Sequence, residues 1–173
     1  MNMLTGLKQK RAWVTHMGCL MGCLEYLKQE VSPAWVYGAS GHAFIVNIHE
    51  ALCPSGPTAW AVESMLRTSK NIGFDLDLVN SHKSVPNFAE EQKRAWDMVR
   101  AAVDKGMPCY AWDLGVPEFY VIRGYDGRGH YCFEKDSRKH YAKLADSGIG
   151  WLWVAAMRPA GPADDRTAVR EAL

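Results

Sequence analysis

The sequence of 173 residues contains no hydrophobic run that approaches the ~20 residues needed for a membrane-spanning helix. Its 20 lysines and arginines nearly balance its 19 aspartates and glutamates, so the net charge of +1 provides no basic surface for nucleic acid or for a membrane. The run that follows Lys8, Lys10 and Arg11 is interrupted by His16 and lacks a clean cleavage site, which argues against a signal peptide. We therefore expect a cytoplasmic protein that binds neither nucleic acid nor membrane.

Matched cysteine pairs are also lacking. The five cysteines are odd in number and irregularly spaced, so they predict no disulfide framework. Cys19 and Cys23 could bind zinc together with His16 or His42, but a second matched pair, which zinc sites of this kind use, is missing. We expect reduced thiols, no metal and no other cofactor.

What the sequence does contain is a helical first half and a β-rich second half. Its 48% hydrophobic residues suffice for one domain, which we place at residues 1–158. Residues 1–14 are expected to form a loosely held lead-in, and residues 159–173 a tail that begins a further helix or a truncated second domain. The periodicity predicts helices at about 18–29, 33–37, 59–71 and 84–105, and strands at 43–48, 74–79, 107–113, 119–125, 130–134 and 150–157. Helices followed by an antiparallel sheet indicate the α+β class.

The first predicted helix holds the best candidate nucleophile. Thr15 is expected to cap this helix, which places Cys19 near its positive N-terminal end, where a thiolate is favoured. Cys23 lies one turn further on the same face and is expected to be part of the core. The alternative for Cys19 is also a buried core thiol, the commonest fate of a free cysteine.

A general base for this thiol has several candidates. His42 follows Gly41 at the start of the predicted strand 43–48 and is the first choice, because the neighbouring segments are expected to pack together. His130, after the turn at residues 126–129, is the second, and His16 is a further candidate beside the helix. Each of them could instead be a histidine with a purely structural role.

Six short motifs follow one another along the chain: Met17 to Leu27 (M-G-C-L-M-G-C-L-E-Y-L), Val31-Ser32, Tyr37-Gly38, Gly106-Met107-Pro108, Tyr120 to Asp126 (Y-V-I-R-G-Y-D) and Gly150-Trp151-Leu152. Together they resemble the papain-like cysteine peptidase superfamily, and more narrowly the bacteriocin-leader peptidase-like domains and the N-terminal domain of the butirosin-biosynthesis acyltransferase type. The resemblance implies a papain-like fold, with N-terminal helices packed on a C-terminal antiparallel sheet, and cysteine-dependent acyl chemistry.

Carried over residue by residue, the resemblance gives a catalytic set of Cys19, Glu118 and Asp136. Glu118 stands where such enzymes have their base histidine, and Trp13 stands near where they have a helper glutamine. A carboxylate beside a thiol raises the pKa of that thiol and opposes thiolate formation.

Three functional readings therefore stay open. The first is a cysteine-dependent amide or thioester hydrolase, or an acyltransferase, in which Cys19 attacks the carbonyl and His42 takes the proton. The alternative is a catalytically inactive papain-like domain that binds a ligand or partner, with Glu118 in the base position. In both, the expected partner is a small-molecule or peptide acyl substrate, and a homodimer is left open. A third reading is an accessory domain whose activity resides in a missing C-terminal continuation.

Overall fold

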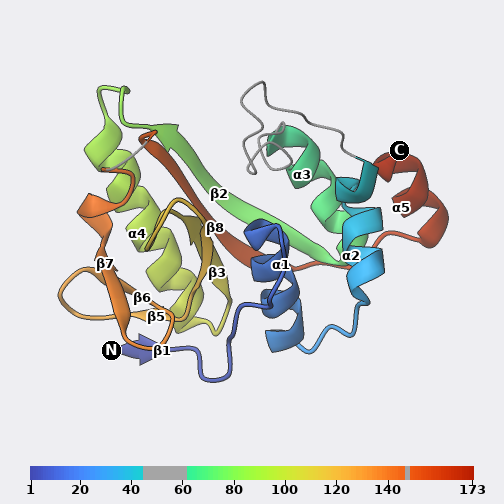
Figure 1. Ribbon diagram of the computed structural model, residues 1–173, viewed down its shortest axis with the longest axis horizontal. Helices are drawn as coiled ribbons and strands as arrows, with labels where there is room; N and C mark the ends of the chain where they lie inside the picture. Colours follow the sequence, from blue (N-terminus) through green and yellow to red (C-terminus); the bar gives the residue numbers. More distant parts are fainter. Residues whose placement is uncertain (45–61, 147–148) are drawn as a thin grey trace.

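The computed structural model describes residues 1–44, 62–146 and 149–173 (Figure 1). In these residues helices and antiparallel strands are mixed, which confirms the α+β class. The helices are α1 (Thr15–Tyr26), α2 (Pro33–Ala39), α3 (Val62–Ser69), α4 (Phe88–Asp104) and α5 (Asp165–Ala172), with 3-10 turns η1 (His42–Phe44), η3 (Lys70–Ile72) and η4 (Tyr141–Lys143). The strands are β1 (Asn2–Met3), β2 (Phe74–His82), β3 (Cys109–Trp112), β4 (Phe119–Ile122), β5 (Gly124–Tyr125), β6 (His130–Phe133), β7 (Ser137–His140) and β8 (Trp151–Pro159).

The strands form two sheets, not the single C-terminal sheet expected. One has the order β2-β8-β3-β4 and the other the order β1-β5-β6-β7. The predicted strand at 119–125 is divided at Arg123, so β4 belongs to the first sheet and β5 to the second. In β8, residues 152–157 are all buried, as expected of a central strand covered on both faces.

Helix α4 lies between the two sheets. It contacts β2 and β8 of the first sheet as well as β1, β5 and η4 next to the second. The ring of Trp96, on α4, contacts the rings of Tyr125, Tyr131 and Tyr141 from the second sheet and η4. Helix α1 packs on the first sheet at β4, away from α4 in Figure 1.

Local sequence signals account for several helix ends. The side chain of Ser32 accepts a hydrogen bond from the backbone N–H of Trp35, with Pro33 at the first position of α2. Asp164 caps α5 in the same way through the N–H of Thr167. Gly73, predicted to stop the third helix, adopts a left-handed φ of 88° after η3.

Three expectations differ from the structure. The lead-in is not loosely held: β1 pairs with β5, and Leu4 and Leu7 are buried. Ala43 and Phe44, expected to begin a strand, belong to η1, because the left-handed Gly41 turns the chain so that the N–H of Phe44 bonds to its carbonyl. The rest of that predicted strand, residues 45–48, and the start of the predicted helix at 59–61 lie outside the described residues.

The C-terminal tail forms α5, which contacts α2. Ala168 on α5 is fully buried, and the side-chain amide of Asn71 donates to the carbonyls of both Ala39 and Ala168. Among the described residues, no helix is both long enough and apolar enough to span a lipid bilayer.

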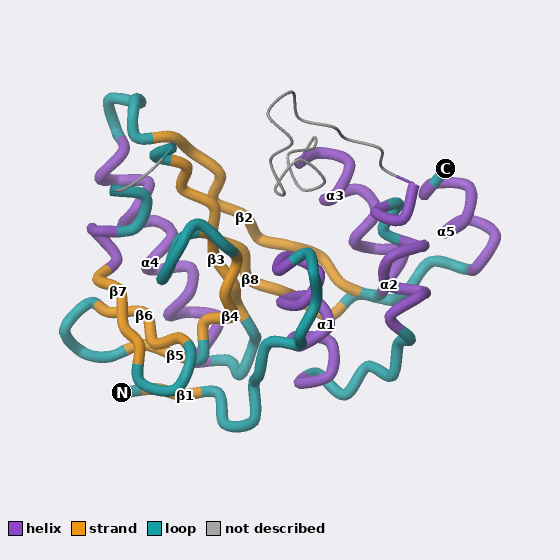
Figure 2. Tube along the Cα trace, viewed as in Figure 1, coloured by secondary structure: helices purple, strands orange, loops and turns teal. Residues whose placement is uncertain are grey.

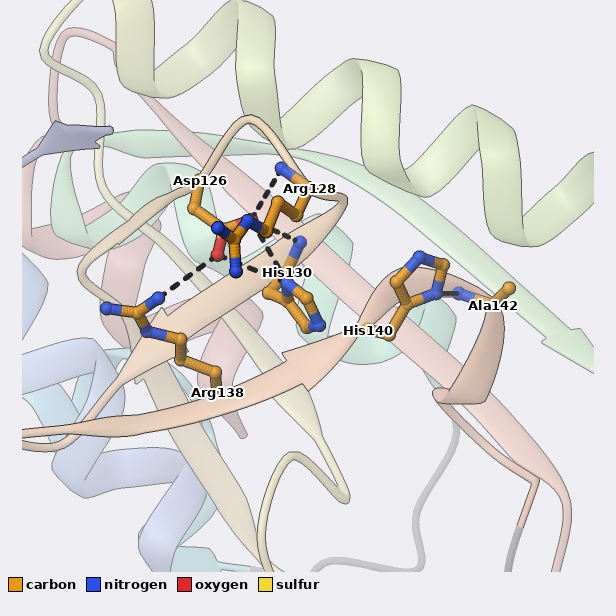
Figure 3. A network of polar contacts seen from close by, with 6 residues as sticks. All are labelled: Asp126, Arg128, His130, Arg138, His140 and Ala142. Carbon is orange, nitrogen blue, oxygen red and sulfur yellow. Dashed lines mark hydrogen bonds and ion pairs between the residues drawn. The ribbon is translucent and has the colours of Figure 1, made fainter.

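The turn between β5 and β6 is organised by the carboxylate of Asp126 (Figure 3). Its Oδ1 accepts hydrogen bonds from the backbone N–H groups of Arg128 and His130, at 2.9 and 3.0 Å, and its Oδ2 accepts one from Arg138 at 3.3 Å. Burial alone would raise the pKa of Asp126, but the N–H groups of His130 and Arg128, together with the His130 ring, lower it to about 2.

We therefore expect Asp126→Ala to destabilise the fold by about 1.5 kcal/mol, because charge-assisted hydrogen bonds contribute about 1.5–3 kcal/mol and the released partners partly reach water. Urea denaturation of the two proteins measures this difference. Asp126→Asn, which keeps an acceptor for the turn, is the matched control and is expected to lose less. Equal stability of Asp126→Ala and wild type would contradict the assignment.

Candidate functional site

One face of α1 carries the sequence-predicted thiol and points into the protein. His16, Cys19 and Cys23 are spaced three and four residues apart, so they share a helix face. All three are buried, and both thiols are fully so. The face covers the first sheet at β3, β4 and β8, as the ring contacts of His16 show.

His16 is enclosed by aromatic side chains from these strands. Its Nε2 lies 3.2 Å from the hydroxyl oxygen of Tyr110, and its ring meets Phe119 and Trp153 edge-on at 5.0 and 5.8 Å between centroids. Burial, together with the charge that His42 can carry, lowers the pKa of His16 to about 3. His16 is therefore a neutral imidazole at physiological pH.

The thiol of Cys19 is held in its protonated form. Burial raises the pKa of Cys19 well above its ordinary value, and the neighbouring Cys23 and Glu118 raise it further. The N-terminal position in α1 was expected to favour a thiolate, but removal from water outweighs a helix-end effect of about 1 kcal/mol.

Glu118, which occupies the position where the resemblance places a base histidine, lies just before β4. Its carboxylate accepts a hydrogen bond from Thr15 at the start of α1. The hydroxyl of Thr15 donates to Glu118 Oε2 at 2.5 Å and accepts from the backbone N–H of Phe119 at 3.1 Å. Thr15 is thus the first residue of the helix and tethers it to β4, while Val14 takes the cap position that was predicted for Thr15. The interaction joins residues 103 apart in the chain, so no local signal predicts it.

The structure brings three of the four predicted site residues to the first half of α1. The charge of Glu118 raises the pKa of Cys19, and the charge that His42 can carry, on η1 beside Tyr37, lowers the pKa of His16. Asp136 does not join them, because it is exposed in the turn between β6 and β7 of the other sheet. His130, the second choice as base, bonds through Nδ1 to Asp126 in that same sheet.

A pocket of about 900 Å³ opens on the other face of α1. It lies between α1, α2, the loop that joins them and the segment before α1. Met21 and Leu24 line it from α1, roughly opposite the cysteine face, and Lys28 lines it just beyond the end of the helix. Its apolar lining residues are Ala12, Met21, Leu24, Val31, Pro33, Val36 and Tyr37.

The N-terminal segment runs alongside α1 in the opposite direction (Figure 2). It contributes Lys10, Arg11 and Ala12 to the pocket lining, and its backbone comes close to the helix at Gly18 and Gly22. The N–H of Lys10 donates to the carbonyl of Gly18 at 3.0 Å. A Cβ on Gly18 would come within 2.5 Å of the Lys10 carbonyl oxygen, and one on Gly22 would overlap that of Lys8. The four-residue spacing of these glycines is therefore the sequence signal that could have revealed the close approach of the N-terminal segment to α1.

Among the described side chains, no group of three or more His, Cys, Asp or Glu residues could hold a metal ion. Comparisons of the chain with protein-family models, with curated proteins and with solved structures found no match. The papain-like resemblance therefore stays a prediction.

Proposed function

We propose that this chain is a catalytically inactive papain-like domain that binds a small molecule in the pocket between α1 and α2. The observation that carries the proposal is the buried Cys19 thiol, whose pKa is raised beside an imidazole whose pKa is lowered. The pocket on the opposite face of α1 offers the surface for a ligand.

Proton transfer from Cys19 to a histidine is disfavoured by the pKa of the donor thiol and by the pKa of the acceptor imidazole. A nucleophilic cysteine needs a lowered thiol pKa and a base able to keep the proton. Here the thiol is a weaker acid than usual, while burial lowers the pKa of both His16 and His42. Glu118 increases this mismatch, since its negative charge opposes the thiolate.

The pocket, by contrast, fits the usual form of a ligand site. Its volume of about 900 Å³ falls within the 300–1,000 Å³ typical of small-molecule pockets. Its apolar floor and charged rim match the usual division between ligand burial and ligand orientation. Its occupation would not require access to Cys19.

We expect Cys19 to react slowly with iodoacetamide at pH 7 in the folded protein. Each unit by which a thiol pKa rises lowers its thiolate fraction roughly tenfold, and burial adds steric protection. The measurement is the rate of labelling of each cysteine by peptide mapping, in native protein and in urea. Faster labelling of Cys19 in the native state than in urea would favour the cysteine hydrolase or acyltransferase instead.

We expect decanol, a neutral apolar probe, to shift the methyl NMR signal of Met21 and to leave that of Met157 unchanged. Met21 lines the pocket, whereas Met157 is fully buried in β8. The protein carries ¹³C-methyl methionine, and Met21→Leu assigns the signal. Cys19→Ala is expected to bind decanol as tightly as the wild type. Absence of a Met21 shift with decanol, with decanoate and with decylammonium would overturn the proposed function.

A further inference from the structure

We infer that the ligand of this pocket is an amphipathic anion, with Arg11 and Lys28 placed to bind its carboxylate or similar head group. The inference rests on the proposed function and specifies its ligand class.

The rim of the pocket is more basic than acidic. Its charged residues are Lys10, Arg11, Glu25, Lys28 and Glu30, so three cations face two anions. Lys10 and Glu25 are already paired, with Nζ and Oε2 2.5 Å apart. What remains is Arg11 and Lys28 against Glu30, an excess of one positive charge. Arg11 makes no ion pair with any residue that the structure describes, and neither does Lys28.

Arg11 and Lys28 approach the pocket from different segments. Arg11 lies on the wall held against α1 at Gly18 and Gly22, and Lys28 follows the C-terminus of α1. A ligand with its apolar body on the floor could therefore bring one anionic group to both cations at the rim. Guanidinium and ammonium groups together are a common pair for carboxylate and phosphate recognition.

Lys28 occupies a backbone position that favours glycine. Its φ is 57°, in the left-handed region. Its N–H donates to the carbonyl of Glu25, and the N–H of Gln29 donates to that of Leu24, the two hydrogen bonds of a Schellman motif. Glycine is the usual residue at this position, because a side chain is strained there. Residues held in such conformations tend to be found at functional sites.

Lys28→Gly therefore separates function from stability. It removes the strain, so we expect the melting temperature to rise by about 2–4 °C. It also removes one of the two proposed head-group contacts, so we expect decanoate to bind about threefold more weakly. Loss of binding in a more stable protein cannot come from unfolding.

The ligand class is tested with three probes that share one apolar body: decanoate, decanol and decylammonium. Calorimetric titration at pH 7.5 is expected to give about tenfold tighter binding of decanoate than of decanol. In the double variant Arg11→Gln, Lys28→Gly this preference disappears, while the affinity for decanol stays within about twofold of the wild type. Lys105→Gln, which removes a cation at the end of α4 outside the pocket lining, is the control for net charge and keeps the preference.

The outcomes distinguish the inference from the proposed function. Equal affinities for decanoate and decanol, or tighter binding of decylammonium, overturn the anionic ligand class while leaving a ligand pocket. The same holds if the double variant retains the full preference for decanoate. Failure of all three probes to bind overturns the proposed function as well.

Discussion

Gly22→Ala is expected to destabilise the protein by about 3 kcal/mol, although alanine is intrinsically the better helix former by about 1 kcal/mol. The new methyl group would overlap the carbonyl oxygen of Lys8 and press on the Cα of Gln9. Both are backbone atoms, so no side-chain rotation relieves the contact. The N-terminal segment has to move away from α1.

This movement would disturb more than one contact. Leu7 of this segment is fully buried. The side-chain amide of Gln9, also in this segment, hydrogen-bonds to the backbone of Phe119 and Val121 on the outer edge of β4. The segment also forms the wall of the pocket that carries Arg11. Gly22→Ala should therefore weaken decanoate and decanol binding together, unlike the head-group variants, which affect decanoate alone.

Gly38→Ala is the matched control. Gly38 lies in the last turn of α2, and a Cβ there would meet no atom within 4 Å. The same substitution is then expected to stabilise the protein by about 0.5–1 kcal/mol. Urea denaturation of the two variants should thus give changes of opposite sign. If both substitutions, Gly22→Ala and Gly38→Ala, stabilised the protein, the N-terminal segment would not lie against Gly22.

The sequence predicts those features that short stretches of chain determine. The cap at Ser32, the glycine stop at Gly73 and the turn at Asp126 each depend on residues within a few positions, and the structure has all three. The second half was correctly predicted to be β-rich. The division at Arg123 was not, since the same apolar run continues across it and only the pairing partners change.

The candidate site was harder to predict, because its chemistry depends on distant residues. Helix position alone suggested that Cys19 is an activated thiol. Its burial is decided by side chains such as Phe119, about a hundred residues away, which close over this face of α1. The pocket also escaped prediction, since its wall is a segment with no periodic pattern. In the sequence, only the pair Gly18 and Gly22 indicates that this segment lies against α1.

The burial of His16 predicts a loss of stability in acid. Its pKa is about 3 in the folded protein and about 6.5 when unfolded, so the unfolded chain binds the proton more tightly. The stabilising effect of keeping His16 neutral is complete above pH 6.5 and declines as the pH falls toward 3. We expect a loss of about 3 kcal/mol between pH 7.5 and pH 4.5 from this residue. The pKa of His42 is also lowered by burial, so its contribution has the same sign.

His16→Phe tests this origin. The variant keeps an aromatic ring among Tyr110, Phe119 and Trp153 but cannot take up a proton. At pH 7.5 it should be less stable than the wild type by about 1–2 kcal/mol, because the buried hydroxyl of Tyr110 loses its partner. At pH 4.5 the order should reverse, since only the wild type has to keep an imidazole unprotonated. Urea titrations at four pH values between 7.5 and 4.5 measure the crossing.

The matched control is His82→Gln, which removes an exposed histidine that lies outside the aromatic cluster around His16 and should not reproduce the crossing. Parallel curves for His16→Phe and the wild type would mean that His16 reaches water in the folded protein. In that case the imidazole would be available as a base beside Cys19, and a cysteine-dependent hydrolase or acyltransferase would become the better assignment. A crossing of the curves would support a neutral imidazole sealed in the core next to a thiol that keeps its proton.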